Sequence, residues 1–133
     1  MIADLCFCSA TLHPIVTRIR IPTFFADGGE CQKSVYGKAV EAMRPNIALV
    51  EERVKAGAWW YGAEWSVLDA YFFWVWFRIT GAGFPARDYP ACAEHACRME
   101  ARPATQRALA REAALERQLA SEGLTFWPPD PPV

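Results

Sequence analysis

The feature that most constrains this chain is the segment from Ala63 to Gly81, AEWSVLDAYFFWVWFRITG, which is apolar on almost every side. Ten of the eighteen aromatic residues lie between Trp59 and Phe77, and β-branched residues are few there. A short apolar run can be a buried strand or a buried helix, so the start signal decides between them. Ser66 is a favoured N-cap residue, and Asp69 three positions later gives a shorter-armed capping box. The segment is therefore predicted to be a helix, and a helix that is hydrophobic on every face belongs at the centre of a bundle.

Four other segments carry helical patterns, at residues 2–20, 32–55, 89–101 and 104–120. In the second of them, one stripe of an amphipathic helix is formed by Met43, Ile47, Val50 and Val54. Pro14 and Pro45 are each expected to kink a helix, whereas Pro103 sits where the first turn of a helix accepts proline. No convincing strand is visible, so the predicted fold class is an all-α bundle of about five helices.

Length and composition limit the remaining possibilities. The 133 residues have the usual size of one domain, and 53% hydrophobic with 22% charged residues exclude intrinsic disorder. A net charge of −1 offers no basic field to attract nucleic acid or a membrane surface, so neither is expected as a partner. We predict one helical domain over residues 1–123 and an extended, proline-rich tail over residues 124–133.

The cysteines and the N-terminus indicate a cytoplasmic protein. The five cysteines are odd in number and contain no C-x-x-C pair, which favours a reduced compartment over a disulfide scaffold. The start, MIADLCFC, has no basic region and no cleavage-like site, so it does not resemble a signal peptide. The longest fully apolar run, Ala70 to Phe77, is far shorter than the about 20 residues that span a bilayer.

Three motifs, in one order and at matching spacing, resemble the C-terminal domain of glutathione transferases. The run WWYGAEWSVLDAYFFWVW is similar to the family's W-x-x-G turn and the S/T-x-x-D capping box that opens its central buried helix. The run YPACAEHACRMEARPATQRAL resembles its closing pattern of a helix, an R-P dipeptide and a final helix. The run SATLHPIVTRI resembles the end of its first C-domain helix, best in the bacterial beta-like branch. The chain has no pattern of the family's N-terminal thioredoxin-like domain, so that domain is expected to be missing.

The resemblance implies a function in detoxification. It implies that the domain binds a small apolar electrophile beside glutathione, the co-substrate, which a thioredoxin-like domain in cis would hold. The resemblance also implies a homodimer. No cofactor and no catalytic residue are expected in this domain alone, so the isolated chain should not conjugate glutathione. The alternative is a non-catalytic protein-binding or assembly module with the same fold.

The resemblance also points to candidate site residues. In beta-like members the histidine at the place of His13 faces the active-site cleft and can contact a thiol, so His13 is a candidate glutathione-proximal residue. The other interpretation is that His13 caps or terminates a helix. The substrate-pocket candidates are Thr11, Trp74 and Phe77. Since a helix turns about 100° per residue, Trp74, Trp76 and Phe77 cannot all face one cleft, and most of the aromatic side chains must be core.

Two other groups of residues suggest chemistry less strongly. The family uses the box of Ser66 and Asp69 for folding, so this pair is predicted to be a structural helix cap. Cys92, His95 and Cys97 share a predicted helix, but Cys97 points away from the other two and no fourth ligand is evident, so no metal site is predicted. Cys6 and Cys8 lack the spacing of a redox pair and are expected to be inert thiols.

Overall fold

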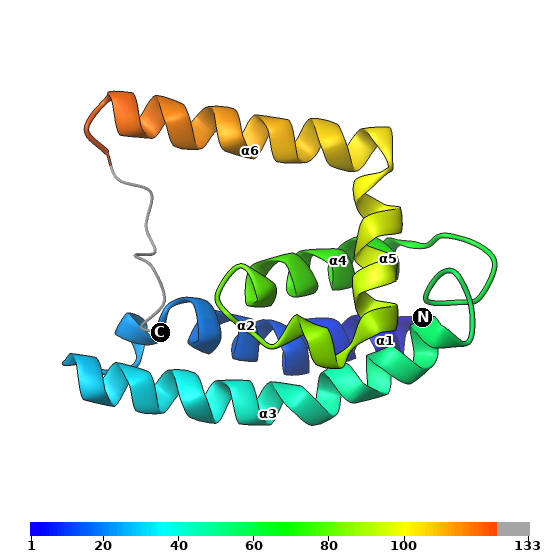
Figure 1. Cartoon of the computed structure of the whole chain (residues 1–133), viewed down its shortest axis with the longest axis horizontal. Helices are drawn as coiled ribbons and strands as arrows, with labels where there is room; N and C mark the ends of the chain where they lie inside the picture. The colour runs from blue at the N-terminus through cyan, green and yellow to red at the C-terminus, as the bar shows by residue number, and fades with distance from the viewer. Residues whose placement is uncertain (125–133) are drawn as a thin grey trace.

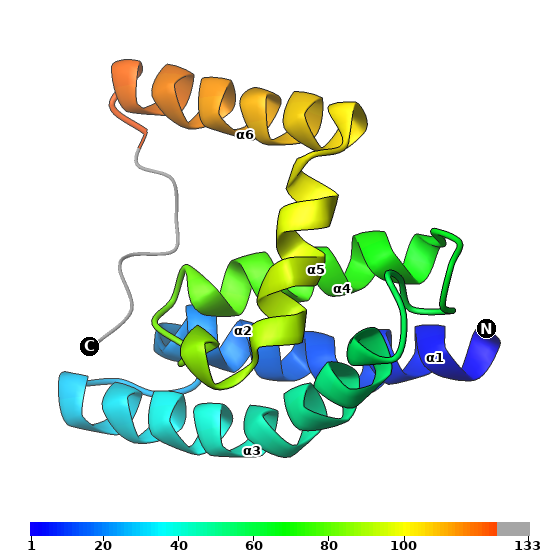
Figure 2. The same cartoon turned by 45° about the vertical axis from the view of Figure 1, so that its right-hand side comes forward.

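The computed structural model of the chain describes residues 1–124, and these residues are almost entirely helical. The α-helices are α1 Ile2–Cys6, α2 His13–Arg20, α3 Gly29–Lys55, α4 Val67–Thr80, α5 Pro90–Glu100 and α6 Pro103–Ser121. A π-helical turn, Phe7–Leu12, joins α1 to α2 into one rod, so that the described part contains five long helical segments. Figures 1 and 2 show how they are arranged. An isolated bridge between Trp59 and Gly62 is its only β pairing. The all-α prediction is confirmed, whereas the predicted tail lies, from Thr125 onward, outside the described residues.

The first rod accommodates Pro14 through the π-helical turn that precedes it. Because proline has no backbone N–H, it cannot close the ordinary α-helical bond to the carbonyl of residue 10. The wider turn Phe7–Leu12 ends just before Pro14, which occupies the first turn of α2. The predicted kink is therefore expressed as a change of helix type within one continuous rod.

By length and composition, one helix in residues 1–124 could cross a membrane, and it is this joined rod, Ile2–Arg20. Core helices of globular proteins meet the same criteria. One side of the rod is buried in the bundle, through Cys8, Leu12, Val16 and Ile19. Asp4 near its start accepts hydrogen bonds from Arg53 at 2.7 Å and from the Tyr61 hydroxyl at 2.6 Å, which tie it to α3 and to the following loop.

The long helix α3 supports this rod along its length. Its predicted stripe is buried, with Met43, Ile47, Val50 and Val54 all at most 2% exposed. Pro45 lies inside the helix and does not end it; Figure 2 shows α3 as one curved rod. Proline removes one hydrogen bond and bends the helix, and burial of the stripe on both sides of Pro45 keeps the two halves together.

Helix α4 is central on one side only. Four of its side chains are fully buried against α2 and α5: Leu68, Phe72, Val75 and Ile79. Phe77, in contrast, is 37% exposed, and Trp74 is half-buried. The prediction that a helix apolar all round lies at the centre of the bundle is therefore correct for one face and wrong for the other.

Helix α6 explains why that face stays uncovered. Figures 1 and 2 show α5 extending out of the bundle. At the end of α5 the chain turns, and α6 runs back above α4. The turn falls at Arg102 and Pro103, where the helix begins. No residue of α6 is buried, so α6 does not complete the hydrophobic core.

Candidate functional site

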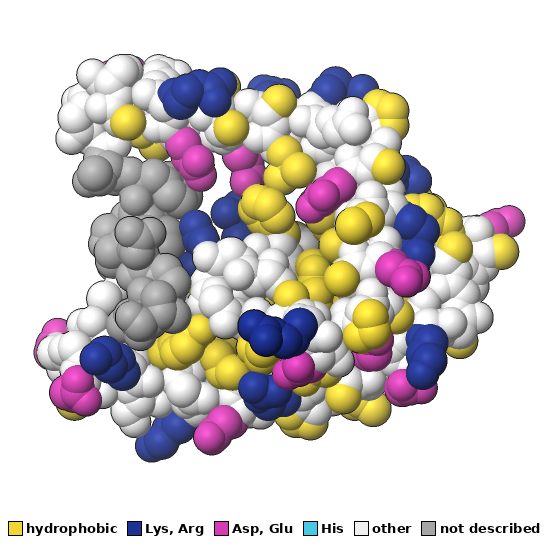
Figure 3. Space-filling model, viewed as in Figure 1, with side chains coloured by type: hydrophobic (Ala, Val, Ile, Leu, Met, Phe, Trp, Pro, Cys, Tyr) yellow, Lys and Arg dark blue, Asp and Glu magenta, His cyan; other side chains and the backbone are white. Residues whose placement is uncertain are grey.

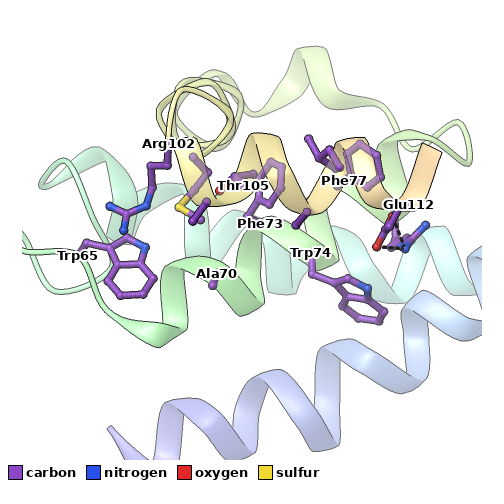
Figure 4. A pocket seen from close by; sticks show the side chains of 13 residues that line it. Trp65, Ala70, Phe73, Trp74, Phe77, Arg102, Thr105 and Glu112 are labelled. Carbon is purple, nitrogen blue, oxygen red and sulfur yellow. Dashed lines mark hydrogen bonds and ion pairs between the residues drawn. The ribbon is translucent and has the colours of Figure 1, made fainter. Parts of the chain in front are cut away.

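A groove of about 340 Å³ lies between α4 and α6, with the C-terminal end of α5 at one end of it. Figure 3 shows hydrophobic side chains gathered between α6 and the rest of the molecule, and Figure 4 shows the groove from close by. Its lining consists of Trp65, Ala70, Phe73, Trp74, Phe77, Arg78, Met99, Arg102, Ala104, Thr105, Ala108, Leu109 and Glu112. Most of these side chains are apolar, and four are aromatic.

The α4 wall is one helical stripe. Phe73 and Trp74 lie three and four residues after Ala70, and Phe77 lies four and three residues after them, so all four are on one face. Two of the substrate-pocket candidates, Trp74 and Phe77, are in this stripe. Trp76 points to the other side and is 5% exposed in the core.

The α6 wall is built from smaller side chains. Ala104, Thr105, Ala108 and Leu109 face α4 from the first half of α6. Because three of these four side chains are small, they do not fill the space in front of the aromatic wall of α4, and the groove between the helices remains open.

Each end of the groove holds an arginine. At one end, the Arg102 guanidinium carbon lies 4.3 Å from the centre of a Trp65 ring and 5.8 Å from a Trp59 ring. Figure 4 shows this stacking of Arg102 over Trp65. At the other end, Arg78 Nη2 donates to both carboxylate oxygens of Glu112, at 3.1 and 3.0 Å, and links α4 to α6.

His13 lies behind the groove. Its ring centre is 4.5 Å from that of Trp74, and its Nδ1 lies 3.0 Å from the Tyr71 hydroxyl. The His13 side chain is exposed, and neither His13 nor Thr11 is among the groove-lining residues. His13 therefore supports the Trp74 wall, and its proximity to glutathione stays a prediction, as does a place for Thr11 in the pocket.

The helix cap predicted for Ser66 and Asp69 is present, and Asp69 also binds two groups of the core outside the cap. Asp69 is fully buried, and its Oδ2 accepts from the Ser66 backbone N–H at 2.8 Å. Its Oδ1 accepts from the Trp60 N–H at 2.7 Å and contacts His95 Nε2 at 2.9 Å. Burial alone would raise the pKa of Asp69, but the hydrogen bonds from His95, Trp60 and Ser66 outweigh it and lower that pKa. Since an ionised carboxylate only accepts, His95 Nε2 must donate.

The turn before α4 brings the Trp60 N–H to this carboxylate. Trp59 and Gly62 exchange backbone hydrogen bonds of 2.9 and 3.0 Å across the turn. Gly62 has a backbone φ of 93°, which residues other than glycine rarely adopt. A Cβ on Gly57 would lie 2.6 Å from the Gly62 Cα, so the chain can cross itself here only with glycine. The W-x-x-G motif thus fixes the entry of α4.

The cysteines and the second histidine lie apart from the groove. Cys92 and His95 are buried on α5, whereas Cys97 is exposed on the same helix. Within residues 1–124, no three His, Cys, Asp or Glu side chains are placed to hold a metal ion. The partnership of His95 with Asp69 could not be read from spacing, because the two residues are 26 positions apart.

Binding is the chemistry that this groove suits best. Glu112 is the one carboxylate among its described lining residues, and Arg78 already holds it. Among residues 1–124, neither a cysteine nor a histidine lines the groove. Its side chains therefore offer stacking surface and positive charge, with no nucleophile–base pair of the kind that acyl transfer requires.

No protein-family model matches the sequence, and no curated protein matches it either. Among solved structures, the chain is similar to a glutathione transferase homologue from Sulfitobacter with bound glutathione, at a TM-score of 0.70 and 20% identity. The match covers 84% of this chain and 54% of that chain, so this chain spans about half the length of that protein. The likeness shows the fold: the described helices form an all-α domain like the C-terminal domain of glutathione transferases.

Proposed function

We propose that the chain is the apolar-ligand-binding domain of a glutathione-transferase-like protein, and that the groove between α4 and α6 is its binding site. The observation that carries this proposal is the groove itself. Its volume of about 340 Å³ lies within the range of small-molecule sites, roughly 300–1,000 Å³.

The shape and chemistry of the walls indicate a flat, apolar ligand. Phe73, Trp74 and Phe77 offer ring faces on one side, and alanine side chains on α6 leave room opposite. Aromatic rings bind other rings by offset or edge-to-face stacking, which adds to the free energy of burying their area. An uncharged aromatic molecule should therefore bind in the groove.

The proposed chemistry divides between two domains. A thioredoxin-like domain in cis would hold glutathione and lower the pKa of its thiol, while the groove would hold the electrophile that the thiolate attacks. His13, Thr11 and a homodimeric assembly belong to this proposal as glutathione-proximal residue, pocket residue and quaternary state. On this view the isolated chain binds an electrophile but does not conjugate it, and turnover of a chloronitrobenzene with glutathione at an ordinary enzyme's rate would contradict the division.

Binding can be tested with the neutral fluorescent probe N-phenyl-1-naphthylamine, titrated into the full chain. We expect saturable binding, because the probe is flat and apolar. Ala108→Trp should fill the groove and weaken binding by about tenfold or more, which corresponds to about 1.4 kcal/mol. Ala110→Trp is the matched control, because Ala110 is exposed on the same helix and does not line the groove. Equal affinity of the two variants, or no saturable binding to the wild-type chain, would refute the assignment.

A second candidate function, an assembly module, is favoured by exposed aliphatic side chains away from the groove. Ile2 on α1 is 80% exposed and Leu49 on α3 is 66% exposed. Exposed apolar surface can mark a protein-binding face. Sedimentation velocity of the full chain and of the Leu49→Lys variant tests this surface: self-association that the substitution abolishes assigns assembly to this face, and a concentration-independent monomer argues against the assembly module and against the homodimer alike.

A further inference from the structure

We propose that the proline-rich end of the chain, TFWPPDPPV at residues 125–133, docks on a tryptophan–arginine surface of a second copy of the chain. This surface, the Trp–Arg platform, consists of Trp59, Trp65 and Arg102. Two of its residues, Trp65 and Arg102, also line one end of the groove between α4 and α6. The proposal does not depend on the ligand of that groove, because it concerns a contact between two chains.

The Trp–Arg platform presents exposed indole beside a cation. Trp65 is 42% exposed. The guanidinium carbon of Arg102 lies 4.3 Å from the centre of a Trp65 ring and 5.8 Å from that of a Trp59 ring, and Figure 4 shows Arg102 over Trp65. Tyr61 in the same loop and Val67 in the first turn of α4 are exposed as well. Large apolar side chains that gather at a surface in this way mark a contact site.

Arg102 has no anionic partner in the described part of the chain. No acidic side chain of residues 1–124 forms an ion pair with it, and its guanidinium donates no hydrogen bond there. A guanidinium stacked on an aromatic face keeps its N–H donors at its edge, where they can bind a carboxylate. The platform therefore lacks one acidic group and a cover for its exposed indole.

The end of the chain carries both of these groups in one short segment. Four of its nine residues are prolines, and they lie in pairs on both sides of Asp130. Because proline fixes φ, such a segment favours the polyproline II conformation and loses little conformational freedom when it docks. Proline-rich segments of this kind bind to exposed aromatic side chains. The prolines would pack on the Trp65 indole, and Asp130 would accept hydrogen bonds from Arg102.

The length of α6 excludes the same contact within one chain. Figures 1 and 2 show that α6 begins at the end of α5 and ends on the opposite side of the molecule. At 1.5 Å per residue, α6 places Leu124 about 30 Å from Arg102. Asp130 follows Leu124 by six residues, which span only about 19 Å in the polyproline II conformation. Asp130 thus falls short of Arg102 in its own chain, and the segment must come from a second copy.

An exchange of charges between Arg102 and Asp130 tests the contact by sedimentation velocity of the full chain. We expect self-association that increases with concentration. Arg102→Glu and Asp130→Lys should each weaken it by about tenfold, the order expected for a hydrogen bond to a charged group. The double variant should recover the association, because it restores opposite charges. Arg107→Glu is the matched control: Arg107 is exposed on α6, and its replacement should leave the association unchanged.

A synthetic peptide of residues 125–133 tests the segment by competition. Added to the wild-type chain, it should dissociate the copies. A peptide with alanine at Phe126 and Trp127 should still do so, because the prolines and Asp130 carry the contact. A peptide with alanine in place of all four prolines should be weaker, because it loses the stiff conformation. Circular dichroism during urea unfolding establishes that each protein variant is folded, and Asp130→Lys changes no residue of the described helices.

The possible results distinguish this inference from the proposed function. A chain that stays monomeric at every concentration overturns the inference, and so does a double variant that fails to associate. Association that Leu49→Lys abolishes and Asp130→Lys leaves intact belongs to the other surface and also overturns it. A peptide that needs Phe126 and Trp127, and that Ala108→Trp makes ineffective, binds in the groove instead of on the platform. None of these results changes the binding of N-phenyl-1-naphthylamine, on which the proposed function depends.

Discussion

At the scale of single residues, Asp69 does the most to organise this protein. One buried carboxylate accepts from the backbone of Ser66 and Trp60, from the Ser66 hydroxyl and from His95. These bonds join the start of α4, the preceding turn and α5. A buried charge is tolerated when its oxygens are all satisfied, and removing one partner of such a network is strongly destabilising.

The Asp69→Asn substitution should therefore lower the free energy of unfolding by about 3 kcal/mol, because an amide presents N–H groups where donors already point. Urea unfolding followed by circular dichroism measures this loss. Asp88→Asn is the matched control: Asp88 pairs with Arg44 at 3.2 Å, and both side chains are nearly half exposed. Loss of stability as small for Asp69→Asn as for the control would show that the network is not required.

The lowered pKa of the Asp69 carboxylate makes the free energy of unfolding depend on pH. Its pKa is lowered in the folded protein, so its contribution to stability is complete above the pKa of the unfolded chain, about 3.9. That contribution is lost as pH falls through the lower folded pKa. The stability difference between wild type and Asp69→Asn should therefore be constant at neutral pH and shrink below about pH 4. A difference that grows on acidification would contradict the lowered pKa.

Thiol reactivity is the third prediction at this scale. Cys6, Cys31 and Cys97 are exposed, whereas Cys8 and Cys92 are fully buried. Burial raises the pKa of the Cys8 thiol to about 11, and burial together with Glu51 raises that of Cys92 further. Since the thiolate is the reactive form, Ellman's reagent should titrate three thiols in the native chain and all five in denaturant. A native count of five would contradict this packing.

At the scale of elements, α3 caps another helix. Both carboxylate oxygens of Glu51 accept backbone bonds at the start of α5, from Ala91 at 2.9 Å and from Cys92 at 2.8 Å. The first N–H groups of a helix have no partner inside it, and α5 has no cap from a side chain of its own N-cap residue, Tyr89. Glu51 replaces that cap from another helix.

The Glu51→Ala substitution should cost about 1 kcal/mol, the usual cost of losing an N-cap. Glu52→Ala is the neighbouring control, because Glu52 is exposed and only pairs with Lys55 at 3.7 Å on the same helix. Thermal and urea unfolding of the two variants compare the costs directly. Equal stabilities would mean that water replaces the cap without loss.

At the scale of the whole molecule, α6 is held by few contacts: Leu109 is partly buried against the core, and one ion pair reaches α4. It contributes no fully buried residue, and the ion pair of Arg78 with Glu112 links it to α4. Such an arrangement leaves the groove beneath α6 open. It also makes α6 the helix that should open most readily, because few buried apolar contacts hold it.

The Glu112→Gln substitution should speed amide hydrogen exchange in α6 by about threefold, the effect of losing a partly exposed ion pair worth less than about 1 kcal/mol. Exchange in α3 should not change. Arg111→Gln, next to Glu112, is the control, because Arg111 is exposed and forms no ion pair in the described part of the chain. Mass spectrometry of peptides from α6 and α3 gives both rates, and unchanged exchange in α6 would show that the ion pair does not restrain it.

The sequence determined the features that depend on neighbouring residues. The all-α class, the stripe from Met43 to Val54 and the start of α4 at Ser66 all follow from local spacing. These predictions hold because helical periodicity and N-capping are properties of a few consecutive residues. Pro45, which the sequence suggested as a kink, only curves α3, because packing on both sides outweighs the loss of one hydrogen bond.

Only the tertiary structure decided which surface is available for binding. A helix that is apolar all round gives no amphipathic signal, so the sequence could not tell the buried face of α4, with Phe72, from the groove face, with Phe77. Contacts between distant positions, such as Asp69 with His95, leave no local pattern either. Local free energies thus determine where the helices form and how α4 is capped, whereas the groove arises from how α5 places α6 over α4.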